Sequence, residues 1–394
     1  MDARAVAAAI VALTAACSPA PAPPAERAGD RPVVRVALFN VRELSVEKIE
    51  VVDDTGAGEH PQLRAVAAIV ARYDPDILVL QEIDAPDATG PAGPAQRFTA
   101  LYLESGAYPF VFSAPTNTGT LSGLDLNGDG IVATDEHRDD RIHGDDAFGF
   151  GTYQGQYGMS VLSRHPIRGD DARSFQRFLW KDFPGNHMPR DFYSDEATAV
   201  LRLSSKSHWD VPLDVNGRML HLLISHPTPP VFDGDEDRNG RRNFDEIGLW
   251  AHYLDDADWL GDDSGRSGGL GNDDPFVVVG DLNASPDNDV IYAGRASISQ
   301  LLDHPRVQES GPNLTSDRDL EERRPGPPTH LERATAKFQG GHRIDYLLPS
   351  VGTEIVDGGV HWPNAATDRA GAEEAETASD HRFIWLDLRL GETD

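Results

Sequence analysis

The chain has 394 residues, of which 39% are hydrophobic, so it can bury a sizeable core in one large domain or two ordinary ones. Its 65 acidic residues outnumber 35 basic ones, and the formal net charge is −30. This balance counts against a protein that binds a polyanion through a basic surface, because contact with a phosphate backbone relies on Lys and Arg. A nuclease is still compatible with this charge balance if bound metal ions supply the positive field.

The first 17 residues have the pattern of a bacterial signal peptide. Arg4 precedes an apolar, Ala-rich stretch at 5–16, and Cys17 follows at the position where a lipoprotein carries its lipid. We therefore expect a lipidated Cys17 and an exported protein, either a lipoprotein of the bacterial cell envelope or an extracellular protein. Cleavage without lipidation and the absence of export are the alternatives. Residues 18–32 are rich in Pro, which predicts an extended tether ahead of the folded domain.

The remainder of the chain, at 33–390, has the pattern of one folded domain. Leu63, Val66 and Ile69 fall at helical spacing, whereas most other apolar runs are short and predict strands. The predicted elements are a strand at 33–41, a helix at 61–73, strands at 76–82, 108–113, 157–164, 197–203 and 218–225, a helix at 246–260, and strands at 275–281, 343–348 and 381–389. Because strands are spread along the whole chain, we expect a single α+β domain built on packed sheets.

Long, polar and acidic stretches separate these elements. They lie at 114–150, 168–196, 228–245, 261–274 and 303–340. Loops of this length are uncommon in a compact domain unless they are functional or separately stabilised.

Two segments, 125–136 and 235–246, have the twelve-residue pattern of a calcium-binding loop. In such a loop alternate side-chain oxygens converge, a Gly allows a sharp turn, and the last Glu binds with both oxygens. The expected ligands of structural Ca²⁺ are Asp125, Asn127, Asp129 and Glu136 in the first, and Asp235, Asp237, Asn239, Asn243 and Glu246 in the second. Acidic, Gly-rich segments arise easily in a chain this acidic, so an ordinary polar loop is the alternative. The second loop follows His226, and contact with substrate is a further alternative for it.

Polar side chains stand at the ends of several predicted strands. A strand-terminal Asn or Asp is usually a turn former, so one such residue would not indicate a site. Six positions from separate segments favour a convergent site instead. They are Asn40, Glu82, His226, Asp281 with Asn283, Asp345, and Asp380 with His381.

Seven short motifs carry these residues in a fixed order. They are Phe39-Asn40-Val41, Leu80-Gln81-Glu82-Ile83, Gly158-Met159-Ser160-Val161-Leu162-Ser163 with the following Arg-His-Pro-Ile, Ser225-His226, Gly280-Asp281-Leu282-Asn283, Arg343-Ile344-Asp345-Tyr346 and Ser379-Asp380-His381. This order resembles the endonuclease/exonuclease/phosphatase superfamily, with its deoxyribonuclease I-like fold, over nearly all of 33–390. The resemblance implies a four-layer α/β/β/α sandwich of two packed mixed sheets flanked by helices, here with long metal-binding loops. It also implies a divalent-metal-dependent hydrolase of phosphate esters.

The resemblance assigns the catalytic metal, Mg²⁺ or Mn²⁺, to three side chains. Asn40, Glu82 and Asp380 would be its ligands, and hard oxygen donors of this kind suit Mg²⁺. Many members of the superfamily have Asp or Asn two residues after the first Asn. This chain has Arg42 there, which leaves that part of the metal or phosphate shell open.

The resemblance also assigns the catalytic roles. His381 would be the general base or acid, and Asp345 would hold its imidazole and raise its pKa. Asp281 would orient or activate the attacking water, while Asn283 and His226 would donate hydrogen bonds to the phosphate. The acidic partner of His226 cannot be identified from the sequence.

Three functions are compatible with these features. The first is a phosphodiesterase, such as an extracellular nuclease or nucleotide phosphodiesterase. The second is a phosphomonoesterase or phospholipid phosphodiesterase on a small or membrane-borne substrate, which the negative charge and the expected lipid anchor favour. The third is a non-catalytic, calcium-stabilised binding protein. The expected partners are a phosphate ester (nucleic acid, nucleotide or phospholipid head group) and, through the anchor, a membrane; no protein partner is implied.

Overall fold

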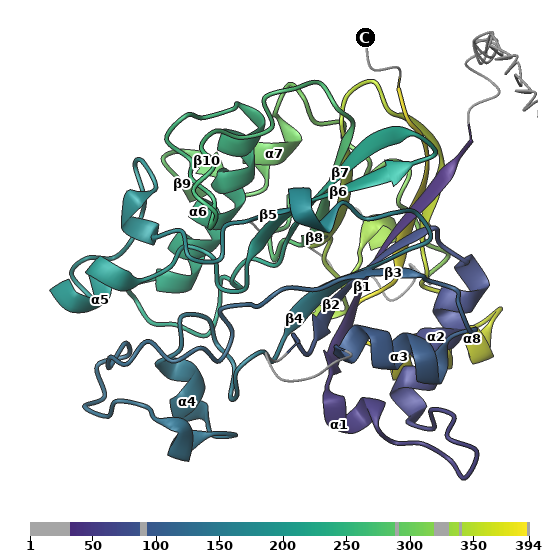
Figure 1. Cartoon of the computed structure of the whole chain (residues 1–394), viewed down its shortest axis with the longest axis horizontal. Coiled ribbons are helices and arrows are strands. Elements are labelled where there is room, and N and C mark those ends of the chain that lie inside the picture. Colours follow the sequence, from purple (N-terminus) through teal and green to yellow (C-terminus); the bar gives the residue numbers. More distant parts are fainter. Residues whose placement is uncertain (1–31, 87–92, 288–290, 319–330, 339–340, 392–394) are drawn as a thin grey trace, which may run out of the picture. The chain divides into compact units, whose positions relative to one another are not determined.

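The computed structural model describes residues 32–86, 93–287, 291–318, 331–338 and 341–391. The described strands form two mixed sheets, in the orders β12-β13-β1-β2-β4-β3 and β11-β8-β7-β6-β5, and a hairpin of β9 and β10 (Figure 1). The first sheet consists of β12 (Glu354–Val360), β13 (Ile384–Arg389), β1 (Val34–Leu44), β2 (Ile77–Ile83), β4 (Gly158–Ser163) and β3 (Phe110–Phe112). The second consists of β11 (Asp345–Pro349), β8 (Phe276–Asp281), β7 (Arg218–Ser225), β6 (His208–Val215) and β5 (Arg173–Ser174). The separate hairpin consists of β9 (Ile291–Tyr292) and β10 (Arg295–Ala296).

The two sheets pack face to face, because alternate residues of each strand point to opposite faces. In β1, Val36 and Leu38 point into a core shared with Leu222 and Val277 of the second sheet. Phe39, on the other face of β1, packs under helices instead. Both faces of each sheet are therefore covered, which explains why the central strands are nearly uninterrupted apolar runs.

Helices form the two outer layers. The first sheet is covered by α2 (Pro61–Tyr73), α3 (Pro94–Tyr102) and α8 (Arg369–Ala378) (Figure 1). The second is covered by α6 (Arg238–Leu254) and α7 (Ser299–Leu302). The shorter helices are α1 (Val46–Ile49), α4 (Arg141–Asp145) and α5 (Asp195–Val200). The predicted α/β/β/α sandwich is therefore confirmed.

Helix α2 has the predicted bounds. Pro61 occupies its first turn, where the missing N–H is not needed. Leu63, Val66 and Ile69 form its buried face, and the chain leaves the helix at Asp74, which has a left-handed conformation. Strands β2, β4, β7 and β8 also lie within about a residue of their predicted ends.

Three predicted elements differ from the structure. The segment 197–203 is no strand, because Ser194 caps helix α5 by accepting a hydrogen bond from the backbone N–H of Ala197. The helix predicted at 246–260 begins at Arg238 and ends at Leu254. The strand predicted at 381–389 begins only at Ile384. Ten elements have no counterpart in the prediction: β5, β6, β9, β10, β12, α1, α3, α4, α7 and α8.

The residues from Val33 onward form one compact unit. The predicted signal peptide at 1–17, with Cys17, and the tether at 18–32, except Pro32, lie outside the described residues. None of the helices in the described ranges is long and apolar enough to cross a membrane.

Candidate active site

The sheet topology brings the polar strand ends together. Strand β1 runs parallel to β2, and β7 runs parallel to β8, so each pair ends at one edge of its sheet. These edges carry Asn40 and Glu82 in the first sheet, and His226 and Asp281 in the second. Strand β11 runs antiparallel to β8 and begins there, with Asp345 in register with Asp281.

A bulge directs Glu82 out of its sheet. The register of β2 against β4 shifts between Gln81 and Ile83, and Glu82 has a positive φ of 62°. A non-glycine residue in this conformation is uncommon and is frequent at functional sites. The bulge turns the Glu82 carboxylate towards the ends of the neighbouring strands.

Asn40 connects the carboxylates of the two sheets. Its Nδ2 donates to Glu82 Oε1 at 3.0 Å and to Asp281 Oδ2 at 3.1 Å. Its Oδ1 accepts the backbone N–H of Arg42 at 3.1 Å. The amide nitrogen of Asn40 therefore points toward the two carboxylates, its oxygen points toward the backbone of Arg42, and its role as a metal ligand stays a prediction.

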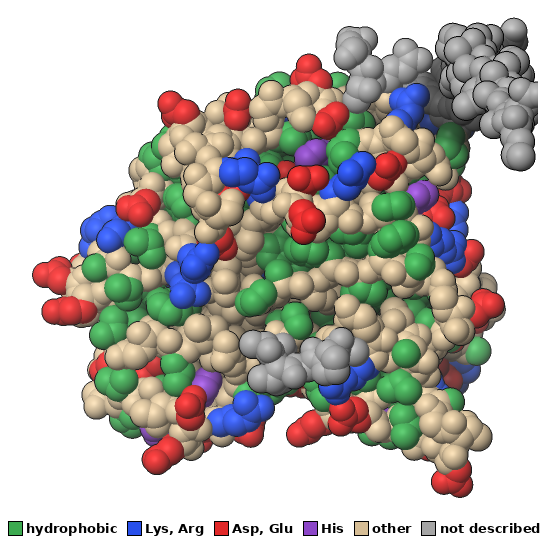
Figure 2. Space-filling model, viewed as in Figure 1, with side chains coloured by type: hydrophobic (Ala, Val, Ile, Leu, Met, Phe, Trp, Pro, Cys, Tyr) green, Lys and Arg blue, Asp and Glu red, His purple; other side chains and the backbone are tan. Residues whose placement is uncertain are grey.

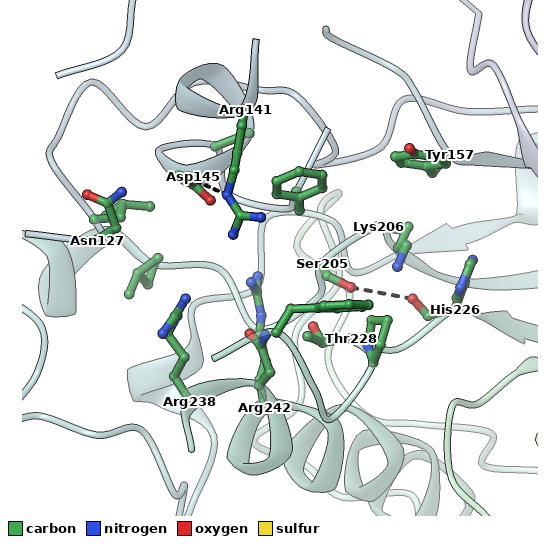
Figure 3. A pocket seen from close by; sticks show the side chains of 18 of the residues that line it. Asn127, Arg141, Asp145, Tyr157, Ser205, Lys206, His226, Thr228, Arg238 and Arg242 are labelled. Carbon is green, nitrogen blue, oxygen red and sulfur yellow. Dashed lines mark hydrogen bonds and ion pairs between the residues drawn. The ribbon is translucent and has the colours of Figure 1, made fainter. Parts of the chain in front are cut away.

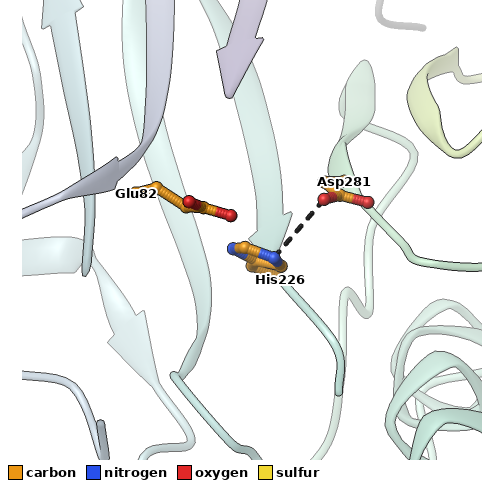
Figure 4. Close-up of side chains that lie close together, drawn as sticks. All are labelled: Glu82, His226 and Asp281. Carbon is orange, nitrogen blue, oxygen red and sulfur yellow. Dashed lines mark ion pairs between the residues drawn. The ribbon is translucent and has the colours of Figure 1, made fainter. Parts of the chain in front are cut away.

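Asp281 lies between two histidines. Its Oδ2 is 3.4 Å from His226 Nε2 and 3.6 Å from His381 Nε2, and all three side chains are almost completely buried. His226 also lies close to Glu82, and Figure 4 shows His226 between Glu82 and Asp281. The acidic neighbour of His226, which the sequence did not reveal, is thus Asp281.

Asp345 holds the imidazole of His381, as predicted. Its carboxylate accepts a hydrogen bond from His381 Nδ1, with Oδ2 at 2.9 Å. Burial disfavours the charged imidazole, but the carboxylates of Asp345 and Asp281 outweigh it and raise the pKa of His381 to about 10. Nδ1 is engaged by Asp345, and Nε2 is left to face the site.

The other two groups respond mainly to burial. Burial raises the pKa of Asp281 to about 7. Burial, with the positive charges of Lys206 and His381, lowers the pKa of His226 well below its ordinary value. The 3.4 Å contact between His226 and Asp281 is therefore one of a neutral imidazole, and not an ion pair.

The residues present fit a divalent metal ion. Glu82, His226 and Asp281 offer ligand atoms that all lie within 4.8 Å of one another, as do Asp281, Asp345 and His381. His226 Nδ1 is buried and has no hydrogen-bond partner in the described structure. Two carboxylates held together at a strand end are a donor set suited to Mg²⁺ or Mn²⁺.

Asp380, the third predicted ligand, is placed differently. Its Oδ2 lies 3.7 Å from the guanidinium of Arg42, and it belongs to neither of the two groups of potential ligands found in the described ranges. Arg42, which departs from the pattern of the superfamily, thus pairs with Asp380. Glu82 belongs to a group of potential ligands, whereas Asp380 pairs with Arg42, and its role as a metal ligand stays a prediction.

Asn283 acts on Asp281 and on the chain after β7. Its backbone N–H donates to Asp281 Oδ1 at 3.0 Å, and its Nδ2 donates to the carbonyl oxygen of Pro227 at 3.1 Å. Asn283 has a φ of 51°, a left-handed conformation that Asn tolerates better than most residues. Its predicted contact with the phosphate stays a prediction.

Gln81, which the sequence did not single out, joins the two sheets beneath the site. Its Nε2 donates to the carbonyl oxygen of Ser225, and its Oε1 accepts the N–H of Asp281 at 2.7 Å. Gly280 is required beside it, since a Cβ there would lie 2.0 Å from the Ser225 oxygen. A buried side chain that satisfies the backbone of Asp281 in this way fixes the position of its carboxylate.

The prediction that 235–246 forms a calcium loop is wrong, because α6 begins at Arg238 and includes most of the segment. Asn239, Asn243 and Glu246 are on this helix, and the last two are completely buried. Glu246 accepts hydrogen bonds from the backbone of Ser205 and Thr228, each at 2.6 Å, so its carboxylate is satisfied without an ion.

The other predicted ligands of that segment are also placed away from a common centre. Asn243 donates through Nδ2 to the carbonyl oxygens of Thr228 and Leu282. Asp237 accepts a hydrogen bond from the hydroxyl of Tyr292, and Asp235 is exposed.

The segment 125–136 does form a tight turn. Asp125 accepts hydrogen bonds from the backbone N–H groups of Gly128, Asp129 and Gly130, while Glu136 is exposed. Asp125, Asp129 and Glu136 are not among the groups of described side chains that converge as potential ligands. A calcium ion bound there by these residues and Asn127 stays a prediction.

A cavity of about 440 Å³ opens beside Glu82 and His226. Segments 126–150 and 226–242 supply most of its lining, together with Tyr157 and Lys206 (Figure 3). Its volume is in the range of small-molecule sites. No sequence pattern indicates this cavity or Lys206, which stands in a run of Ser residues that has the composition of a polar loop.

The comparisons with known proteins agree with this arrangement. The model of the Endonuclease/Exonuclease/phosphatase family matches residues 37–381. The chain belongs to this family. The family is one of phosphoester hydrolases, and its model spans all the strand ends that converge at the site. A search of curated proteins found no match.

Several solved structures align with most of this chain. An endonuclease/exonuclease/phosphatase from Beutenbergia cavernae is 20% identical, with a TM-score of 0.51 over 92% of this chain and 72% of that one. A mannosyl-6-phosphatase from Bacteroides thetaiotaomicron is 12% identical, with a TM-score of 0.46 over 90% and 99% of the two chains. Sphingomyelinase C from Streptomyces griseocarneus is 14% identical, with a TM-score of 0.45 over 90% and 99%. At 20% identity, the first of these likenesses is one of fold.

Proposed function

We propose that the protein is a divalent-metal-dependent phosphodiesterase that acts on small phosphate esters. The observation that carries the proposal is the convergence of Glu82, Asp281, His226 and the His381–Asp345 pair at one edge of the two sheets. These side chains are the ones that hydrolysis of a phosphate ester requires: oxygen ligands for a metal ion, a carboxylate near the attacking water, and imidazoles near the phosphate.

Glu82 and Asp281, with His226, would hold the metal ion. When bound, this ion neutralises charge on the phosphate oxygens and polarises the phosphorus centre. Asn40 keeps the two carboxylates apart and in place through its two hydrogen bonds.

The remaining residues position water and phosphate. Asp281 stands between the two histidines, where its carboxylate can orient a water molecule for in-line attack and accept its proton. His381 donates from Nε2 to a phosphate oxygen, because Asp345 occupies its other nitrogen. A water molecule then protonates the leaving oxygen, and the hydroxide that remains takes the proton from Asp281, which restores the carboxylate.

Lys206 favours a second candidate, a phosphomonoesterase. It is 8% exposed and lines the cavity beside His226, and its amine adds a positive charge next to the phosphate site when it is protonated, although burial lowers its pKa. A monoester carries one more negative charge than a diester, so this cation stabilises the monoester more strongly. Cleavage of a diester or of a monoester distinguishes the two candidates.

The test offers purified protein with Mg²⁺ or Mn²⁺ three substrates: bis-p-nitrophenyl phosphate, p-nitrophenyl phosphate and plasmid DNA. We expect cleavage of the first to exceed that of the others, to stop with EDTA, and to fall about 10³-fold or more in His381→Ala. His165→Ala is the matched control, because this half-exposed imidazole follows β4 at the opposite edge of the sheet. Cleavage of the monoester alone would establish the second candidate, and equal rates in wild type and His381→Ala would reject both.

A further inference from the structure

The cavity beside the catalytic residues is lined with cations, in a chain of net charge −30. Arg141 reaches into it from one wall, and Arg238 and Arg242 reach into it from the opposite wall, while Lys206 stands near His226 (Figure 3). Because acidic residues outnumber basic ones almost two to one in the whole chain, this local excess of positive charge needs an explanation.

Lys206 is the most deeply buried of these cations. Its side chain has no hydrogen bond or ion pair with any described residue, and its position is fixed by its neighbours. The carbonyl oxygen of Lys206 accepts the N–H of Asn117 at 2.8 Å, and the adjacent Ser205 is held by Glu246. The carboxylates of Glu246, Glu82 and Asp281 act on its charge, and the side chain lines the cavity, where it can also contact a bound anion.

The three arginines are only partly neutralised. Arg242 donates to the carbonyl oxygens of Leu203, Phe148 and Arg202 and forms no ion pair with a described carboxylate. Arg141 pairs with Asp145 through Nε alone, at 3.2 Å, and its side chain is 68% exposed.

Arg238 pairs through Nη1 with Glu236, next to α6. The far end of the cavity therefore keeps N–H groups that can bind a second anion.

We infer that the cavity binds the organic part of a small phosphoester that carries a second anionic group, a phosphate or a carboxylate. Lys206 contacts the phosphate at the catalytic end, and Arg141 and Arg238 contact the second anion. The inference rests on the proposed function, since it assigns the phosphate at the catalytic end to the reacting ester. It narrows the substrate class to compact molecules with two anionic groups, which a cavity of about 440 Å³ can enclose.

Binding is measured by calorimetry on the full chain with Mg²⁺, using butylphosphonate and butane-1,4-diylbisphosphonate, which have no ester bond to cleave. We expect the bisphosphonate to bind at least about tenfold more tightly, as one charge-assisted contact would give. Arg141→Gln, which changes an exposed side chain, should reduce this preference to about threefold or less. Lys206→Met, which removes the buried charge but keeps its volume, should weaken both ligands about tenfold.

Arg369→Gln is the matched control, because it removes one positive charge from α8, where the side chain is 83% exposed. It should change neither dissociation constant. Equal affinities of wild type for the two phosphonates, or an unchanged preference in Arg141→Gln, would overturn the inference. Ester hydrolysis is measured separately: cleavage without the preference leaves the proposed function standing, and the preference without cleavage of any ester rejects the proposed function instead.

Discussion

At the scale of single residues, the site depends on pairs in which one side chain sets the state of another. Asp345 gives His381 both its orientation and its charge. Asn40 and Gln81 hold Asp281 in place: Asn40 donates a hydrogen bond to its carboxylate, and Gln81 accepts one from its backbone N–H. Such supporting residues are buried and make no contact with solvent, so their effect on a reaction is indirect.

The Asp345–His381 pair leads to a prediction. Asp345→Asn keeps the size of the side chain but removes the charge that holds the imidazole, and we expect kcat to fall about 10²- to 10⁴-fold. Because the two residues act as a unit, the double variant Asp345→Asn/His381→Ala should be no slower than His381→Ala alone. The measurement is kcat on the ester that wild type cleaves, with circular dichroism to confirm folding. Rate losses that multiply in the double variant would show that Asp345 acts independently of His381.

At the scale of elements, the polar residues at strand ends can be predicted from the sequence. The site residues that lie between elements cannot. Alternating apolar runs reveal strands, and a polar residue at the end of such a run is visible in one dimension. The segment around Lys206 is held by residues that are distant in sequence: Asn117 donates to the carbonyl oxygen of Lys206, and Glu246 accepts the N–H of Ser205. No local pattern reveals such a contact.

The errors in the elements have local causes. Strand β6 was missed because it contains Pro212 and the buried polar residues His208 and Asp210, although Asp210 is satisfied by His221 and Tyr253. The segment 197–203 predicts a strand because of Val200, Leu201 and Leu203, although Ser194 and the two acidic residues in the first turn of α5 indicate a helix start. The predicted start of helix α6 is eight residues too late, because its first turns are rich in Arg and Asn.

Helix α6 leads to a second prediction, which separates a structural Glu246 from a calcium ligand. Glu246→Gln places an amide donor where the carboxylate accepts backbone N–H groups, and should lower the free energy of unfolding by about 2–3 kcal/mol. Asp235→Asn, at the exposed first position of the same sequence pattern, should change it by less than about 0.5 kcal/mol. Urea unfolding with calcium and with EGTA measures both effects. If calcium stabilised wild type but neither variant, the segment would bind the ion after all.

At the scale of the whole molecule, the charge around the catalytic site differs from the charge of the surface. The sandwich gathers catalytic groups from both sheets at one edge, and the cavity beside them is locally cationic. The surface is acidic: acidic side chains are spread over the face drawn in Figure 2, with basic ones scattered among them. A small anion is therefore attracted only once it enters the cavity, where the cations are close.

This contrast predicts how salt affects two substrates. A nuclease with six or more basic contacts to phosphates loses about 10³- to 10⁵-fold in DNA affinity between 50 and 200 mM salt. Here the net charge is −30, so duplex DNA is repelled and added salt screens that repulsion. We expect the initial rate on supercoiled plasmid, divided by the rate on bis-p-nitrophenyl phosphate, to stay level or rise between about 50 and 200 mM NaCl at fixed Mg²⁺. Dividing by the rate on the small diester removes the effect of salt on the chemical step. A ratio that fell about tenfold or more would mean that a basic surface binds the duplex, and nucleic acid would then replace small esters as the substrate class.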